Sequence, residues 1–263
     1  MTKIALVTGG SSGIGLQTAI ALKEAGCRVY ICSRRPFSAE GLIHLTADVT
    51  DEKQLAEAVN TIAEKEGRLD ILVSNAGMGI SGAVEFTTDA EARRLMDVNL
   101  FGMANAAKAA LPHMRKQGGG RIVFLSSVAA PIPIPFQTWY SVSKAGVNAL
   151  ALALADEARP FGISVCAVMP GDICTGFTDA REKSALGDDV YGGRIARSVA
   201  VMERDERGGM AAETAGRAIA RLALKKRVKP LSSIGVKYKF FIMLQRLIPN
   251  ALCRAIVRML YGG

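Results

Sequence analysis

The chain contains 263 residues, of which 49% are hydrophobic and 22% are charged, and it has a formal net charge of +9. These values are typical of a globular protein with a sizeable core, and they exclude a disordered or low-complexity chain. No window approaches the roughly 18 to 20 uncharged apolar residues of a membrane-spanning helix, so we expect none.

The net charge is unevenly distributed along the chain. Nine Lys or Arg residues and no Asp or Glu lie between residues 225 and 263, so the remainder carries 24 basic and 24 acidic groups. A neutral body argues against nucleic-acid binding, for which a basic face is typical. Five cysteines without metal-ligand spacing predict reduced thiols and no metal site. An apolar strand is predicted within three residues of the first residue, so we expect no secretory signal and a cytoplasmic location.

Short apolar runs alternate with longer amphipathic segments along the body of the chain. This alternation predicts an α/β protein with a Rossmann-type, doubly wound, seven-stranded parallel sheet and helices on both faces. Between residues 33 and 43 there is room for only a short turn of helix. The predicted strands are 3–8, 28–33, 43–47, 69–74, 121–126, 163–169 and 228–232, and the predicted helices are 13–25, 51–66, 88–99, 102–117, 138–160 and 211–224.

A glycine-rich turn follows the first predicted strand directly and runs into the first predicted helix. Glycines let the backbone approach a pyrophosphate closely, and the helix N-terminus stabilises the negative charge. The strand before this turn and the helix after it favour a dinucleotide site over a plain tight turn. The residues that we expect to hold the cofactor here are Gly9, Ser11, Ser12, Gly13, Ile14 and Gly15.

The end of the second predicted strand reads Ser33-Arg34-Arg35. An NAD site normally places an acid here against the ribose hydroxyls. Two guanidinium groups and a hydroxyl would instead accept a 2′-phosphate through charge-assisted hydrogen bonds. The sequence therefore predicts NADP(H) as the cofactor. His44 and His113 are interpreted as structural residues.

Tyr140 and Lys144 lie four residues apart, which places both on one face of the predicted helix. A phenol titrates near pH ~10 in model peptides, so it needs a nearby cation to act as an acid or base at neutral pH. We therefore expect Lys144 to lower the pKa of Tyr140 and Tyr140 to act as a proton donor.

With these two motifs, the chain resembles the short-chain dehydrogenase/reductase family, in its NADP(H)-preferring form, from residue 1 to about residue 232. The motifs occur in the family's order: TGGSSGIG at 8–15, Asp48-Val49, Asn75-Ala76-Gly77, Asn99 in DVNLFG, Ser127, YSVSK at 140–144, and Pro170-Gly171 followed by Thr175.

The resemblance implies a role for each matching residue. Tyr140 would be the general acid, Lys144 would bind the nicotinamide ribose, and Ser127 would donate to the substrate carbonyl oxygen. Asn99 would anchor a water that links Lys144 to solvent. The other residues that the resemblance places at the cofactor are Asp48, Val49, Asn75, Ala76, Gly77, Pro170, Gly171, Ile173 and Thr175.

Two further segments bear on the substrate. Residues 175–210 have weak periodicity, and we expect a mobile flap that covers the substrate at the carboxyl edge of the sheet. After one catalytic domain at 1–232, residues 233–263 read as a basic, amphipathic extension packed on or beside it, with two short helices in 237–261 broken at Pro249. The extension can dock on one of three surfaces, which are the protein's own substrate cleft, another subunit and an anionic membrane surface.

The sequence thus predicts an NADPH-dependent oxidoreductase that reduces a ketone or aldehyde to an alcohol. The apolar extension favours a lipophilic substrate such as a sterol, a retinoid or a long-chain carbonyl. One alternative is a 3-oxoacyl-acyl-carrier reductase, and another is a non-catalytic NADPH-binding sensor or scaffold. The intact Asn99, Ser127, Tyr140 and Lys144 argue against the non-catalytic alternative. The resemblance further implies a homodimer or a homotetramer.

Overall fold

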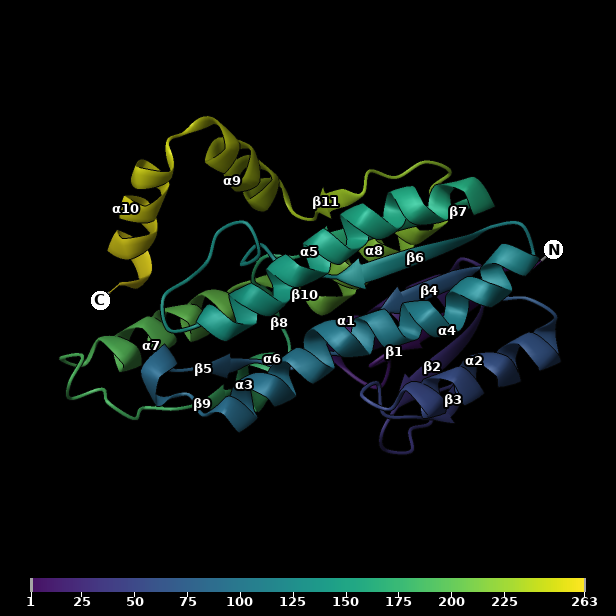
Figure 1. The fold of residues 1–263 in the computed structure, drawn as a ribbon, viewed down its shortest axis with the longest axis horizontal. Coiled ribbons are helices and arrows are strands. Elements are labelled where there is room, and N and C mark those ends of the chain that lie inside the picture. Colours follow the sequence, from purple (N-terminus) through teal and green to yellow (C-terminus); the bar gives the residue numbers. More distant parts are fainter. Residues whose placement is uncertain (1, 263) are drawn as a thin grey trace.

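A computed structural model describes residues 2–262, and it places a seven-stranded parallel sheet at the centre of the molecule (Figure 1). This confirms the predicted fold class. Met1 and Gly263, which end the two predicted units, lie outside the described residues. In spatial order the strands are β11 (Leu231–Ser233), β7 (Ile163–Met169), β6 (Gly120–Leu125), β4 (Ile71–Ser74), β1 (Ile4–Thr8), β2 (Arg28–Ser33) and β3 (Leu42–Thr46).

Helices cover both faces of the sheet. On one face α1 (Gly13–Glu24) packs against α8 (Ala212–Leu224), and on the other lie α2 (Glu52–Glu66), α4 (Gly102–Lys116) and α5 (Thr138–Ala158) (Figure 1). Since helices bury both faces, the central strands are apolar throughout, and every residue of β1 and β4 is buried. The loops at the carboxyl ends of β1, β4, β6 and β7 therefore meet along one edge.

The predicted helices 88–99 and 102–117 form one continuous rod. The helix α3 (Asp89–Met96) passes into a π-helical segment, Asp97–Phe101, which leads directly into α4. A π-helical turn widens the helix locally and often occurs at functional sites. Here it contains Asn99, whose side chain is fully buried.

The segment between β2 and β3 contains no helical turn, so the prediction of a short one was wrong. Pro36 lacks a backbone N–H and disfavours helical geometry at Arg35, while Gly41 adopts a positive φ of 73°. Together these residues lead the chain from β2 into β3 without a crossover helix. The seventh strand also begins later than predicted, at Leu231.

The segment 175–210 is more regular than predicted. It contains α6 (Phe177–Ala180), β9 (Glu182–Lys183), α7 (Arg194–Arg207) and β10 (Met210–Ala211). The buried residues Ile195, Ser198 and Met202 recur at helical spacing in α7, but charged residues between them masked the pattern in the sequence. We call residues 175–184 the lid. The lid pairs through β9 with β5 (Ile80–Ser81), and β10 pairs with β8 (Ile173–Cys174).

Two helices, α9 (Val236–Leu247) and α10 (Asn250–Tyr261), form the end of the chain and arch above the body (Figure 1). The break near Pro249 matches the predicted one. Tyr238 donates to Asp172, Arg254 donates to the carbonyl of Pro133 at 2.9 Å, and Tyr261 donates to Asp205 at 3.2 Å. We call residues 236–261 the tail. Among the helices in residues 2–262, none is both long and apolar enough to cross a bilayer.

Short 3-10 turns at Val84–Phe86 and Arg159–Phe161 complete the secondary structure of the body.

Candidate active site

The glycine-rich turn lies between β1 and α1 at the carboxyl edge of the sheet. Gly9 and Gly13 both have positive φ angles, 64° and 52°, which side chains rarely adopt. Ser12 is the N-cap residue of α1, and its exposed side chain makes no capping hydrogen bond. Ser11, Ile14 and Gly15 complete the turn, whose backbone N–H groups at the helix start are suited to a pyrophosphate.

Asn75 holds the loop after β4 against this turn. Its Nδ2 donates to the carbonyls of Thr8 at 3.1 Å and Gly9 at 3.2 Å. A Cβ atom on Gly15 would lie 2.3 Å from the Gly9 oxygen and 2.4 Å from Nδ2 of Asn75, so only glycine fits there. The backbone N–H of Ala76 donates to the Thr8 hydroxyl at 3.2 Å. The motifs 8–15 and 75–77 are thus brought together.

Arg34 and Arg35 follow β2 and are exposed at the same edge. Ser33 Oγ donates to the Arg35 carbonyl at 2.9 Å and lies 2.9 Å from His44 Nε2. Sequence reasoning missed this contact of His44, because only the pairing of β2 with β3 brings it beside Ser33.

The motif Asp48-Val49 follows β3. Asp48 Oδ1 accepts from the backbone N–H and the hydroxyl of Thr50, at 2.9 and 2.8 Å. Val49 is buried, and a Cβ atom on Gly102 of α4 would lie only 2.8 Å from its side chain. The pair therefore sits where the loop after β3 meets α4.

Tyr140 and Lys144 lie on one face of α5, next to the loop that follows β6. The Lys144 ammonium is 5.6 Å from the centroid of the Tyr140 ring, and it donates to the carbonyl of Leu125 at 2.7 Å. The Ser127 hydroxyl lies within hydrogen-bonding reach of the Tyr140 phenol. Three of the four predicted catalytic groups therefore converge.

Asn99 supports this cluster from the π-helical segment. Its Oδ1 accepts from the backbone N–H of Met78 at 2.8 Å, and its Nδ2 donates to the Met78 carbonyl at 2.9 Å and to Ser143 Oγ at 3.2 Å. A Cβ atom on Gly77 would lie 3.2 Å from Asn99 Oδ1 and 3.7 Å from Lys144 Nζ. Asn99 therefore lies close to Lys144, across Gly77.

The electrostatics of the pair differ from the prediction in direction. Burial raises the pKa of Tyr140 to about 12, although the hydrogen bond with Ser127 lowers it in part. Burial also lowers the pKa of Lys144 to about 7. For Tyr140 the charges of Glu206 and Arg181 act in opposite directions, so desolvation dominates at both groups and favours their neutral forms. In this structure the expected lowering of the Tyr140 pKa by Lys144 is therefore absent.

The segment after β7 completes the edge. The Pro170 carbonyl accepts from Val128 at 2.9 Å, Ile173 is buried in β8, and a Cβ atom on Gly13 would lie 3.6 Å from Cβ of Thr175. A Cβ atom on Gly171 would lie 2.2 Å from the Tyr238 ring, so the tail packs directly on this motif.

Sequence reasoning missed the lid residues nearest to Tyr140. The Phe177 ring lies 5.9 Å from the Tyr140 ring, centroid to centroid. Arg181 is 3% exposed, forms an ion pair with Glu206 of α7, and lies over the Phe177 ring. The sequence carried little signal for them, because a two-residue strand pairing positions the lid.

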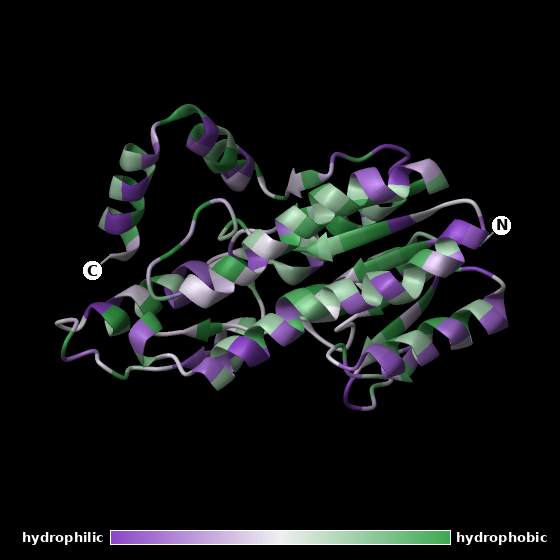
Figure 2. Cartoon of the chain, viewed as in Figure 1, coloured by the Kyte–Doolittle hydropathy of each residue, from purple (hydrophilic) through white to green (hydrophobic). Residues whose placement is uncertain are grey.

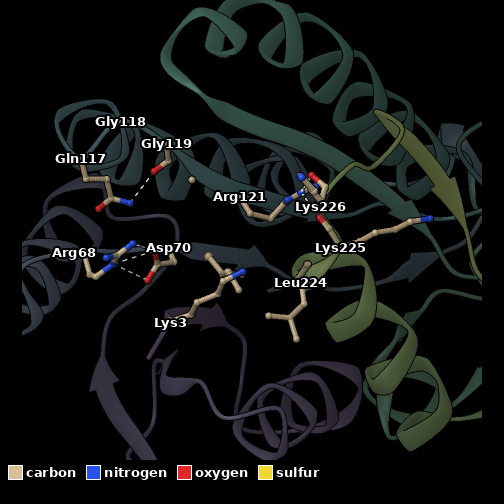
Figure 3. Close-up of a pocket in the computed structure, with 13 residues that line it drawn as sticks. Lys3, Arg68, Asp70, Gln117, Gly118, Gly119, Arg121, Leu224, Lys225 and Lys226 are labelled. Atoms are coloured by element: carbon tan, nitrogen blue, oxygen red, sulfur yellow. Dashed lines mark hydrogen bonds and ion pairs between the residues drawn. The ribbon is translucent and has the colours of Figure 1, made fainter. Parts of the chain in front are cut away.

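A pocket of about 300 Å³ lies at the opposite edge of the sheet (Figure 3). Its lining includes Lys3 before β1, Asp70 before β4 and Lys225 after α8. Arg121 reaches from the start of β6 to the Lys225 carbonyl at 2.6 Å and thereby caps the end of α8. This pocket is separate from the cluster around Tyr140.

Comparisons with known proteins agree with this geometry. A family model described as short chain dehydrogenase matches residues 3–185. A relative named 3-ketodihydrosphingosine reductase, from Bacteroides thetaiotaomicron, is 42% identical over 236 residues, which cover 89% of this chain and 88% of the relative. A short-chain dehydrogenase structure from Streptomyces avermitilis superposes with a TM-score of 0.82 at 30% identity, covering 94% of this chain and 92% of that one.

Solved structures with similar folds differ in their cofactors. The structure of ElxO with NADP bound has a TM-score of 0.76 at 29% identity and covers 91% of this chain and all of its own. A 3-ketoacyl-(acyl-carrier-protein) reductase from Brucella melitensis complexed with NADH has a TM-score of 0.73 at 25% identity, covering 88% of this chain and 96% of its own.

The parallel sheet and the cluster at its carboxyl edge define an oxidoreductase of the Rossmann-like class. The chain belongs to the short-chain dehydrogenase family.

Proposed function

We propose that the protein reduces a long-chain ketone to the secondary alcohol, with NADPH as the hydride donor and Tyr140 as the proton donor. The observation that carries the proposal is the convergence of Ser127, Tyr140 and Lys144 beside the glycine-rich turn. Hydride arriving at a carbonyl carbon builds negative charge on the oxygen, and two hydroxyl donors at that oxygen stabilise the charge.

The fit to a nicotinamide cofactor rests on this chain's own residues. The turn 9–15 leads into the N-terminus of α1, where no side chain caps the helix at Ser12, and its glycines let the turn pack closely against the loop after β4. We propose that Ser33, Arg34 and Arg35 hold the 2′-phosphate of NADPH, because two exposed guanidinium groups attract that charge. When bound, the cofactor supplies the hydride.

Several features support a lipophilic substrate. The loop 131–136 reads PIPIPF and lies beside the tail, to which Arg254 links it. The relative from Bacteroides thetaiotaomicron is named 3-ketodihydrosphingosine reductase. A 3-oxoacyl-acyl-carrier reductase is a second candidate, favoured by the basic tail, because a carrier protein is acidic.

We further propose that the tail contacts an anionic membrane surface. Nine of the sixteen large apolar side chains that are exposed in residues 2–262 lie in the tail, among them Phe240, Leu247 and Met259. Figure 2 shows that hydrophobic and hydrophilic residues alternate along both helices of the tail. The tail contains Lys and Arg but no Asp or Glu. Apolar side chains with basic neighbours are typical of helices that bind at a lipid surface.

We also propose a homodimer or homotetramer, since Phe101, Val142 and Leu152 expose apolar side chains on the rod and on α5. Sedimentation velocity measures this state, and a monomer at micromolar concentration contradicts it.

A kinetic comparison tests the proposed reaction. The purified full-length chain should oxidise NADPH faster than NADH with a long-chain 3-keto substrate. Tyr140→Phe should lower kcat by at least about 100-fold, the lower range for positioned acid catalysis. The Kd for NADPH, measured by fluorescence titration, should change little. A Tyr140→Phe variant with wild-type turnover would contradict the assigned proton donor, and equal use of both cofactors would contradict the NADPH preference.

A further inference from the structure

Buried polar atoms without a hydrogen-bond partner gather around Tyr140. Seven such side-chain atoms occur in residues 2–262, and five of them belong to Ser81, Trp139, Ser141 and Arg181. These residues lie on β5, on the first turn of α5 and on the lid, which are the elements next to Tyr140. An unpaired buried polar group lowers stability, so such groups are uncommon and require an explanation.

Arg181 is the most unusual of these residues. Its side chain is 0% exposed and forms an ion pair with Glu206 through Nη2, while Nε and Nη1 have no partner. The other Glu206 oxygen accepts from the hydroxyl of Thr178 at 2.8 Å, so both carboxylate oxygens are used. Two nitrogen atoms of a buried guanidinium, which together carry three N–H groups, therefore remain without an acceptor.

One aromatic ring separates this guanidinium from Tyr140. The Arg181 Cζ lies 5.7 Å from the centroid of the Phe177 ring, and that centroid lies 5.9 Å from the centroid of the Tyr140 ring. A Cβ atom on Gly79 would lie 2.9 Å from Phe177 and 3.5 Å from Arg181, so Gly79 leaves room for both side chains. The two-residue pairing of β5 with β9 and an ion pair between Glu182 and Arg94 of α3 join the lid to this side of the site.

We propose that Arg181 is a substrate-binding residue whose Nε and Nη1 donate to a second oxygen of the substrate, a few bonds from the reacting ketone. The substrate would take the place of the Phe177 ring beside Tyr140, and its second oxygen would satisfy the two unpaired donors. This inference rests on the proposed function, because it places the ketone at Tyr140.

The charge balance selects a neutral oxygen. Arg181 and Glu206 neutralise each other, so a carboxylate at the same place would add an unbalanced buried charge. A hydroxyl or a carbonyl oxygen accepts both hydrogen bonds without adding charge. The substrate class is therefore a ketone with a neutral oxygen nearby. This oxygen is the hydroxyl of a long-chain hydroxy ketone or the thioester carbonyl of a 3-oxoacyl thioester.

The test measures a ratio of kcat/KM values with NADPH and substrates of equal chain length. The numerator uses a 1-hydroxy-3-ketone, or in a second arm a 3-oxoacyl thioester, and the denominator uses the plain 3-ketone. A hydrogen bond from a charged donor contributes about 1.5–3 kcal/mol, so Arg181→Met should lower the ratio roughly 10- to 100-fold. The arm with the larger drop identifies the source of the second oxygen.

Arg207→Met is the matched control. Arg207 lies in the same charged cluster and pairs with Asp179 and Glu203, but its side chain is 58% exposed. Arg207→Met should leave the ratio of kcat/KM values as in the wild type. If the role of Arg181 were merely structural, Arg181→Met would lower kcat/KM for all three substrates alike.

Three results overturn the inference while leaving the proposed reaction intact. They are a wild-type protein that reduces the plain ketone as well as both oxygenated ones, an Arg181→Met ratio within twofold of wild type, and an equal loss for every substrate. If Arg181→Met does not fold, Arg181→Lys takes its place, because it keeps the charge beside Glu206 but loses the planar fork. A wild-type protein that reduces none of the substrates overturns the proposed function itself.

Discussion

Lys144 is a buried amine. Its side chain is 4% exposed, and its ammonium has the carbonyl of Leu125 as a neutral acceptor. Burial lowers its pKa from 10.5 to about 7. The site therefore keeps a group that titrates near neutral pH beside the phenol of Tyr140, which suits a proton relay.

This environment predicts a pH-dependent stability. Between pH 7 and pH 10.5 the unfolded chain keeps a proton on Lys144 that the folded protein has lost, so the free energy of unfolding rises with pH across this window. Lys144→Met removes the effect. Compared with the wild type, Lys144→Met should have a free energy of unfolding that is higher by on the order of a few kcal/mol at pH 6, and by less at pH 9.5.

Urea unfolding at the two pH values measures the gain. Lys108→Met is the control, because Lys108 lies exposed on α4 beside Glu52. The free energy of unfolding of Lys108→Met should differ little from that of the wild type at both pH values. A Lys144→Met gain that is equal at pH 6 and pH 9.5 contradicts the lowered pKa.

At the scale of elements, the close packing of two loops fixes the glycine-rich turn. Asn75 joins the loop after β4 to the loop after β1, and Gly15 leaves the space that this bond needs. Alanine in a helix is favoured over glycine by up to about 1 kcal/mol, so its propensity alone would stabilise α1. The added Cβ atom would lie 2.3 Å from the Gly9 oxygen, and the cost of relieving this overlap should be larger than the gain in helix propensity.

Gly15→Ala should therefore lower the free energy of unfolding by about 1–3 kcal/mol, as overpacking does. It should also weaken NADPH binding, because the turn must shift. Gly176→Ala is the control, since a Cβ atom there meets nothing within 4 Å and its φ is −64°. Urea unfolding and cofactor titration provide both readouts, and equal stabilities of the two variants would count against the packing argument.

The sequence predicted the elements that carry their own periodicity. The strands of the central sheet and the pair Tyr140 and Lys144 depend on local patterns, and the structure places them as expected. The lid could not be predicted, because β5 and β9 are two residues each and form only when distant segments meet. For the same reason, no local pattern indicated that Arg181 and Glu206 would pair.

At the scale of the whole molecule, the tail is attached at its ends and exposed along its length. Arg194 of α7 donates to the Gly262 carbonyl at 2.6 Å, and Tyr238 holds the start of α9 at Asp172. Between these points Phe240, Leu247 and Met259 expose apolar side chains, whereas Val257 is buried. The arch is thus held in a fixed place relative to the loop 131–136.

The proposed membrane contact predicts a charge effect that depends on position. Each basic residue near an anionic surface contributes about 1 kcal/mol, so Arg246→Glu with Arg258→Glu should weaken vesicle binding on the order of 100-fold. Lys53→Glu with Lys65→Glu changes the net charge equally but lies on α2, and it should have little effect.

Flotation with vesicles that contain anionic phosphatidylserine measures the binding. Phe240→Ser with Met259→Ser removes two exposed apolar side chains and should weaken binding at constant charge. If the tail variant and the α2 variant weaken vesicle binding equally, the electrostatic attraction is not specific to the tail, and the tail is not the membrane contact.

The strand order also determines when the sheet is completed during synthesis. β7 lies beside β6 on one side and β11 on the other, and β11 is the last strand to leave the ribosome. Until then, one row of backbone groups on β7 has no neighbour and can pair with another nascent chain. Chains that end prematurely before Leu231 would therefore aggregate, even though Asn99, Ser127, Tyr140 and Lys144 have already been made.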